Sequence, residues 1–132
     1  MSKKLVTDYM TVEKQLISFQ PDTDIYFAIE TLINRSISGA PVVDKKGNLV
    51  GVLSEKDCLR VLMEMGMHEM PAGLVEEFMT KEVVTMDSTK TILDAVWLFR
   101  NSAFRRFPIV EGKKLVGLLT RRDVLRAVKD IK

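Results

Sequence analysis

The hydrophobic positions of the chain change period several times, and each change predicts a new element. Short apolar runs at 16–19 and 83–86 predict buried strands. After each run come polar turn residues and then apolar residues three or four apart, which predicts amphipathic helices over about 25–32 and 92–99.

Caps and hairpins complete this pattern. We expect Asp24 or Asp22 to cap the first helix and residues 87–89 to cap its counterpart, because short polar side chains accept the free N–H groups of a helix start. Strands opened by Pro41 and Pro108 then lead through glycine-containing turns into return strands. The expected turns, return strands and closing helices lie at 45–48, 49–53 and 55–65, and at 111–114, 115–119 and 121–129.

The order β-α-β-β-α therefore occurs twice, because the chain is an internal repeat. Tyr9-Met10-Thr11 resembles Phe78-Met79-Thr80, and 39–53 resembles 106–119 with a turn one residue shorter. We expect the first repeat in residues 1–65, a linker with some helical character at 66–77, and the second repeat in 78–132. A unit of about 50 residues buries little surface alone, so we expect an α+β fold with the repeats packed sheet to sheet about a pseudo-twofold axis, leaving two related clefts.

Composition narrows the class of protein. Of the 132 residues, 46% are hydrophobic and 29% are charged, which is typical of a globular domain. No apolar run approaches the roughly 20 residues that cross a bilayer, and no apolar segment follows the basic start as in a secretory signal. A single cysteine excludes an intrachain disulfide. We therefore expect a cytoplasmic protein without a membrane partner.

The net charge of +2 is unevenly distributed. Residues 1–66 hold 8 Lys and Arg against 9 Asp and Glu, whereas 67–132 hold 12 against 9. The basic excess is either a solvated face or a set of arginines that meet phosphate.

One motif carries most of the chemical information: Gly-h-h-Ser/Thr-x-x-Asp, where h is apolar. It occurs at 51–57 and again at 117–123, each time between a predicted strand and a predicted helix. Ser54 with Asp57, and Thr120 with Asp123, have the spacing of a helix capping box, which needs no ligand. The same junction also suits phosphate and ribose, because free N–H groups favour anions and a carboxylate accepts hydrogen bonds from a cis-diol.

With the opening h-Met-Thr, the proline-led strand and this motif all duplicated, the chain resembles a CBS domain pair, or Bateman module. The resemblance implies a regulatory domain that binds an adenosine-containing ligand between the repeats. It implies that Asp57 and Asp123 hold ribose hydroxyls and that Ser54 and Thr120 contact ribose or phosphate. It also implies that the base meets six further positions: Val52, Leu118, and backbone near Ile17, Val84, Ala40 and Phe107.

Many members of this family place a basic pair before the proline to meet phosphates. The second copy has Arg105-Arg106 there, and arginine matches phosphate oxygens well. The first copy reads Ser38-Gly39-Ala40 and has no cation. We therefore expect the pocket that Arg105 and Arg106 reach to hold the more charged ligand.

Other candidate residues give no catalytic or metal site. His68 is the only histidine, expected at the surface, and Cys58 the only cysteine, expected as a small core residue. No metal-ligand spacing, catalytic triad or phosphate-binding glycine loop is present, so we do not expect an enzyme. The methionines at 63, 65, 67 and 70 are expected to fill core, or else to form a contact surface, and Trp97 to be partly exposed at a helix interface.

The resemblance thus implies a nucleotide-sensing module that binds AMP, ADP or ATP, or S-adenosylmethionine, and signals to a separate effector protein. By resemblance we expect a homodimer. One alternative is a purely structural dimerisation module with empty clefts. The other is a nucleic-acid binder that uses the basic second half, although no aromatic platform or helix-turn-helix signal supports it.

Overall fold

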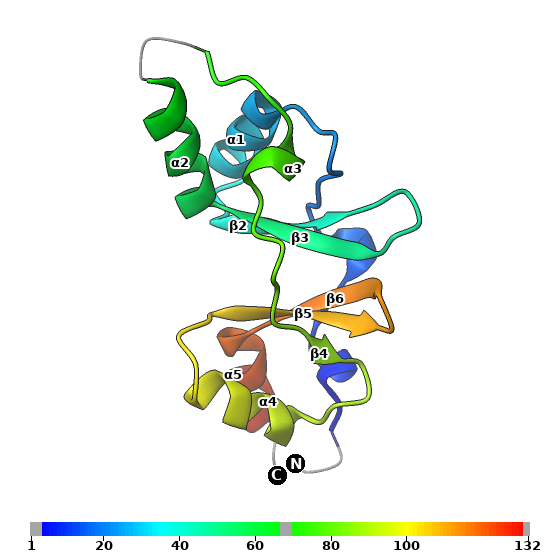
Figure 1. Ribbon diagram of the computed structural model, residues 1–132. Coiled ribbons are helices and arrows are strands. Elements are labelled where there is room, and N and C mark those ends of the chain that lie inside the picture. The colour runs from blue at the N-terminus through cyan, green and yellow to red at the C-terminus, as the bar shows by residue number, and fades with distance from the viewer. Residues whose placement is uncertain (1–3, 67–69, 131–132) are drawn as a thin grey trace. The chain divides into compact units, whose positions relative to one another are not determined.

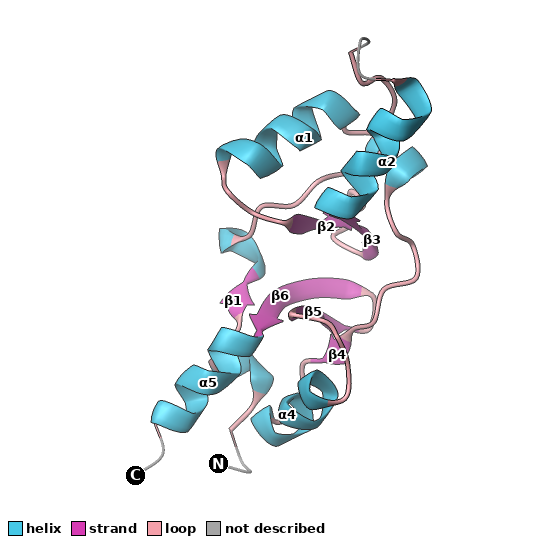
Figure 2. Ribbon diagram, turned by 90° about the vertical axis from the view of Figure 1, so that its left-hand side faces the viewer, coloured by secondary structure: helices cyan, strands magenta, loops and turns pink. Residues whose placement is uncertain are grey.

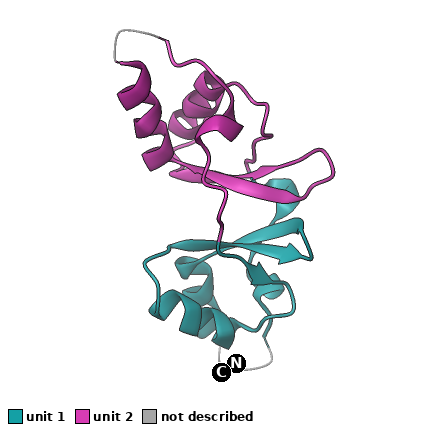
Figure 3. Ribbon diagram, in the orientation of Figure 1, with its two compact units in different colours: residues 1–16, 84–132 teal, residues 17–83 magenta. Residues whose placement is uncertain are grey.

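The computed structural model describes residues 4–66 and 70–130, and the chain forms two compact units, which Figure 3 distinguishes by colour. Unit 1 contains residues 1–16 and 84–132, and unit 2 contains residues 17–83. Met67 and His68, for which the sequence predicts a core or contact position and a surface position, lie outside the described residues.

Unit 2 is a β-hairpin covered by helices (Figure 1). Its elements are α1 (Ile25–Asn34), β2 (Gly39–Val43), β3 (Leu49–Ser54), α2 (Glu55–Met65) and α3 (Val75–Phe78). Strands β2 and β3 pair antiparallel. The apolar run predicted as an opening strand contributes only a single parallel bridge, between Phe19 and Val42. The strand predicted at 16–19 is therefore reduced to this isolated bridge.

Unit 1 has the same plan with a longer sheet. Its elements are η1 (Val6–Asp8), β1 (Thr11–Val12), η2 (Glu13–Gln15), β4 (Met86–Asp87), α4 (Ile92–Arg100), β5 (Arg106–Glu111), β6 (Lys114–Thr120) and α5 (Arg121–Lys129). The strand order is β1-β6-β5-β4, with β4 parallel to β5 and the other pairs antiparallel. Helices α4 and α5 lie on one side of this sheet in both Figure 1 and Figure 2. The α+β fold predicted from the periodicity is confirmed.

The repeat is visible in the two hydrophobic cores, which use equivalent positions. Each core contains the inward residues of its first helix, its hairpin and its closing helix, and both are almost fully buried. The equivalent buried residues are Ile25, Ala28, Leu32, Ala40, Val42, Leu53 and Val61 in unit 2, and Ile92, Ala95, Phe99, Phe107, Ile109, Leu119 and Ala127 in unit 1. Burial of these side chains is the main force that holds each unit together.

The two repeats exchange their opening segments. Val6, from the start of the chain, is buried in the core of unit 1, and its N–H donates to the carbonyl of Lys90. Val75 takes the equivalent place in unit 2, where its N–H donates to Thr23 O. The sequence repeats at 1–65 and 78–132 are therefore not the compact units, because each opening segment packs against the other copy.

The exchange also explains the stretch predicted as a linker. Its described part includes most of the short helix α3, and Val75 of that helix is fully buried. The chain from 66 to 77 thus supplies core to unit 2 as well as connecting the repeats.

Several local predictions need correction. The cap of α4 is Thr91, not residues 87–89, because the helix starts later and Thr91 forms a capping box with Asp94. Asp24 caps α1, accepting from Phe27 N–H at 3.2 Å, as one of the two alternatives predicted. Met63, on the outer side of α2, and Met70, beyond the end of that helix, are exposed and do not fill the core. Met65, in contrast, packs against the core of unit 2.

Among the described residues, none of the helices is both long enough and apolar enough to cross a bilayer.

Candidate functional site

The motif of the first copy forms a capping box at the start of α2. The Ser54 N–H and hydroxyl donate to Asp57 Oδ2 at 2.9 and 3.0 Å, and the Asp57 N–H donates back to Ser54 Oγ at 3.1 Å. The other carboxylate oxygen, Oδ1, accepts from the Thr80 hydroxyl at 3.1 Å. Asp57 thus uses one oxygen for the helix start and directs the second toward a donor outside the helix.

The motif of the second copy forms the same box at the start of α5. The Thr120 N–H donates to Asp123 Oδ2 at 2.8 Å, and the Asp123 N–H donates to Thr120 Oγ1 at 3.1 Å. Here Oδ1 accepts from the Arg126 guanidinium at 2.7 Å. Asp123 is only 7% exposed, so this ion pair compensates a carboxylate that is largely removed from water.

Hairpin register places the segment before each proline beside its motif. Gly39 pairs with Ser54 in unit 2, and Arg106 pairs with Thr120 in unit 1. The side chains of the next residues, Ala40 and Phe107, are buried in the cores, so only their backbone is available to a ligand.

The apolar residue after each motif glycine lies on the face of its hairpin that points away from the core of its unit. Val52 and Leu118 are half-buried, whereas their neighbours Leu53 and Leu119 are fully buried, because successive side chains of a strand point to opposite faces. Of the other two positions implied for the base, Ile17 is half-buried against the core of unit 2 and Val84 is 45% exposed in unit 1.

Thr80 is the residue that sequence reasoning missed. The h-Met-Thr segment served there only as a mark of the repeat. In the structure Thr80 forms a backbone bridge with Val52, and its hydroxyl donates to Asp57. Its counterpart Thr11 pairs with Leu118 in β1–β6. Joint duplication of the threonine and the motif was the signal that could have linked them.

The motif glycines are explained by the same segments. A side chain at Gly51 would lie 2.9 Å from the Thr80 carbonyl oxygen, and one at Gly117 would lie 2.7 Å from that of Thr11. A methionine covers each glycine as well, Met79 in unit 2 and Met10 in unit 1. Only glycine lets the opening segment approach the strand this closely, so the two parts of the family pattern depend on each other.

Each unit therefore brings together the candidate residues of its own copy. Unit 2 holds Ile17, Ala40, Val52, Ser54 and Asp57. Unit 1 holds Val84, Arg105, Arg106, Phe107, Leu118, Thr120 and Asp123.

Cys58 is half-buried beside the core of unit 2. Burial, with smaller contributions from the charges of Asp57 and Glu55, raises the pKa of the Cys58 thiol to about 11. A thiol with so high a pKa is a poor nucleophile at neutral pH, which agrees with the structural role predicted for it. Within 4–66 and 70–130, no group of His, Cys, Asp or Glu side chains is arranged to hold a metal ion.

Comparison with known proteins gives consistent results. The family model for the CBS domain matches residues 6–64 and 75–130. The chloroplastic CBS domain-containing protein CBSX2 of Arabidopsis thaliana is 29% identical over 153 residues, which cover 96% of this chain and 64% of CBSX2. The uncharacterized protein MJ1225 of Methanocaldococcus jannaschii is 27% identical over 116 residues, which cover 87% of this chain. The chain spans 40% of the length of MJ1225.

Two solved structures extend the comparison to ligand complexes. The crystal structure of CBSX2 in complex with AMP has a TM-score of 0.82 and 32% identity, covering 96% of each chain. The CBS domain pair of protein MJ0100, in complex with 5'-methylthioadenosine and S-adenosyl-L-methionine, has a TM-score of 0.75 and 25% identity, covering 98% of each chain. The duplicated motif, the shared fold and the family match lead to one conclusion: the chain belongs to the CBS domain family.

Proposed function

We propose that this chain is a regulatory module that binds an adenosine-containing ligand and reports its binding to a separate effector protein. The observation that carries the proposal is the arrangement of the two motif carboxylates. In each, one oxygen closes the capping box and the other accepts a hydrogen bond from a second side chain, that of Thr80 for Asp57 and that of Arg126, in the same helix, for Asp123. A ribose hydroxyl is a donor of the same kind.

Capping alone would account for the first oxygen but not for the second. In the capping box of Thr91 and Asp94, which lies outside the motif, Asp94 accepts from the Thr91 N–H at 2.9 Å in the same way. Both motif carboxylates also bind a side chain that is not part of the box, Thr80 from outside α2 and Arg126 from within α5. That second bond, which a capping box does not need, supports a role for Asp57 and Asp123 beyond the helix start.

The ligand class follows from the relatives and from the charges of unit 1. CBSX2 and the MJ0100 domain pair are two similar proteins whose structures hold adenosine-type ligands. We propose AMP, ADP or ATP as the ligand, with S-adenosylmethionine as the alternative. Ser54 and Thr120 would contact ribose or phosphate, and Arg105 and Arg106 would bind phosphate oxygens, since arginine forms multidentate bonds to them.

Calorimetric titration of the wild-type chain with AMP, ADP, ATP and S-adenosylmethionine tests this proposal. We expect micromolar binding of at least one ligand and its loss in Asp123→Ala. Asp94→Ala is the matched control, because it removes an equivalent capping carboxylate from the same unit. Binding that survives Asp123→Ala and Asp57→Ala together, or no binding by the wild type, would contradict the proposal.

We also propose that the module is a homodimer formed through helix surfaces. Both units expose large apolar side chains in i, i+4 pairs on their helices: Leu59 and Met63 on α2, and Leu93 and Trp97 on α4. Burial of such pairs in an interface would recover hydrophobic free energy. Sedimentation velocity should give a dimer that dissociates in Trp97→Lys. A dimer that binds no adenosine ligand would favour the purely structural alternative.

A further inference from the structure

Arg121, the first residue of α5, makes hydrogen bonds to three successive carbonyl groups. Its Nε–H donates to Phe104 O at 3.1 Å and its Nη2 donates to Ala103 O at 3.3 Å. Its backbone N–H donates to Arg105 O, also at 3.1 Å. One residue thus ties down the segment 103–105, which precedes β5 and has no regular structure of its own.

Local helix chemistry does not account for an arginine at this place. The N-terminus of a helix carries a partial positive charge, so a cation there is unfavourable. Arg121 and Arg122 both occupy this first turn. The first copy has an acidic residue, Glu55, at the equivalent position. A residue that breaks a local rule commonly has a function in return.

The first copy also shows which contacts are special to the second. The backbone bond is common to both, since the Glu55 N–H donates to Ser38 O at 2.9 Å. In the second copy the Arg121 side chain adds two bonds, which hold the carbonyls of Ala103 and Phe104. That segment is the one that contains the basic pair.

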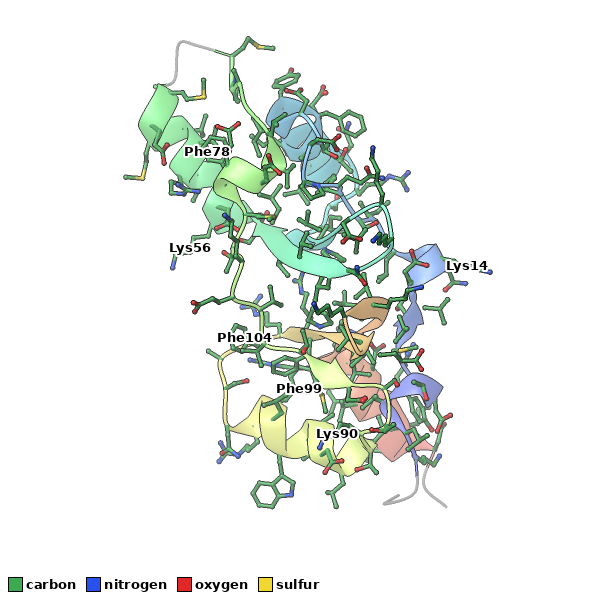
Figure 4. All side chains as sticks on the ribbon, turned by 45° about the vertical axis from the view of Figure 1, so that its right-hand side comes forward. Lys14, Lys56, Phe78, Lys90, Phe99 and Phe104 are labelled. Carbon is green, nitrogen blue, oxygen red and sulfur yellow. The ribbon has the colours of Figure 1, made fainter. Side chains whose placement is uncertain are left out.

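The segment is fixed from the core side as well. The ring of Phe104, labelled in Figure 4, packs edge-on against Phe107 with 5.6 Å between the ring centroids, although 51% of Phe104 remains exposed. Arg121 therefore fixes the backbone carbonyl groups of the segment, while the ring of Phe104 anchors the segment to Phe107. The backbone that leads into Arg105 and Arg106 is fixed between these two contacts.

We propose that Arg121 is a positioning residue that fixes Arg105 and Arg106 in the geometry that phosphate oxygens require. The inference rests on the proposed function, since it assigns to Arg121 the discrimination between phosphorylated ligands and adenosine. Two arginines bind one phosphate well only when their backbone is already ordered, because ordering a loop on binding costs free energy. Arg121 provides that order before the ligand arrives.

Affinities for adenosine, AMP, ADP and ATP, measured by calorimetry on the full chain, test the inference. For Arg121→Ala we expect a loss of about tenfold for ATP, as for two hydrogen bonds of ordinary strength, and adenosine affinity unchanged within about twofold. Arg121→Lys should lose nearly as much, because a single ammonium keeps the charge but cannot reproduce the planar fork. Arg122→Ala, which removes the adjacent cation, is the matched control.

Hydrogen exchange on the ligand-free protein gives a second readout. Backbone amides over 103–106 should exchange faster in Arg121→Ala and not in Arg122→Ala. If Arg121→Lys keeps full ATP affinity, or Arg122→Ala loses as much as Arg121→Ala, the effect is one of charge and the positioning role is wrong. If the wild type binds ATP and Arg121→Ala binds it equally, only this inference fails. If the wild type binds no ligand, both proposals fail.

Discussion

The two units place the same carboxylate in the same capping box and then give it different partners. In unit 2 the second oxygen of Asp57 accepts from a neutral hydroxyl, that of Thr80. In unit 1 the second oxygen of Asp123 accepts from a guanidinium, that of Arg126. A ligand diol would have to replace a neutral hydrogen bond in one unit and a charged one in the other, and the charged bond is the stronger.

The opening segments that pack on the two units differ at this place by one hydroxyl group. Arg60 is the counterpart of Arg126, and it pairs with Glu64 at 3.0 Å while its guanidinium lies over the ring of Phe78. In unit 1 the residue that matches Phe78 is Tyr9, whose hydroxyl donates to Asp130, the counterpart of Glu64, at 2.8 Å. With Asp130 engaged by Tyr9, Arg126 binds Asp123 and the Tyr9 carbonyl.

The lesson is that a repeat can keep its motif and still diverge in chemistry through the segments that pack on it. Tyr9 and Phe78 belong to the exchanged openings, not to the motif.

Gly117→Ala should destabilise the fold more than Gly51→Ala. The added methyl group meets the Thr11 carbonyl at 2.7 Å in unit 1 and the Thr80 carbonyl at 2.9 Å in unit 2, and backbone cannot move aside easily. We expect a loss of about 3 kcal/mol for Gly117→Ala and about 2 kcal/mol for Gly51→Ala, the range of overpacked sites. Urea unfolding measures both, and a loss below about 0.5 kcal/mol at either site would contradict the close approach.

Arg126→Met should cost more than Thr80→Val, because it leaves the buried Asp123 carboxylate without a cation. We expect about 1 kcal/mol for Arg126→Met, a value lowered by the 58% exposure of the Arg126 side chain. Thr80→Val should cost about half as much. The loss of unfolding free energy should shrink at about 1 M salt only for Arg126→Met, because salt at that concentration screens charges. Equal salt dependence of the two variants would show that the partners are electrostatically alike.

Tyr9→Phe should make unit 1 resemble unit 2. Without the hydroxyl, Asp130 becomes available to Arg126 at the i, i+4 spacing that Arg60 and Glu64 use. We expect a loss of about 0.5 kcal/mol, as for one exposed hydrogen bond. The coupling between Arg126 and Asp123, measured by a double-mutant cycle, should fall in the Tyr9→Phe background. Phe78→Tyr is the reciprocal variant, and an unchanged cycle would show that the hydroxyl does not direct the arginine.

Cys58→Val should have the smallest effect, because valine stands at the equivalent position, Val124, in unit 1. We expect a change below about 0.5 kcal/mol at neutral pH. The thiol pKa is raised from 9.0 to about 11 by burial, so its stabilising contribution is complete below pH 9 and is lost as the pH rises toward 11. The wild type should therefore lose stability in that window relative to Cys58→Val. Rapid labelling of the folded thiol at pH 8 would contradict the raised pKa.

Most local elements were determined by the sequence. The helices predicted at 55–65 and 121–129 have those bounds, and both hairpins form around the predicted glycine turns. These elements depend on periodicity, caps and turn residues, which are properties of neighbours in the chain. The cap at 87–89 was wrong because Ser and Thr occur throughout that stretch, and the actual helix start depends on contacts of Thr91 with the exchanged segment.

The residues of the candidate site were also readable, since the Gly-h-h-Ser/Thr-x-x-Asp motif occurs twice in register. What only the tertiary structure decided is which side chains of the exchanged openings meet the acids of each unit. Thr80 lies 23 residues from Asp57, and Tyr9 lies 121 residues from Asp130. The exchange of openings brings these residues together, and it depends on burying Val6 and Val75 in the opposite cores, a packing that no local pattern encodes.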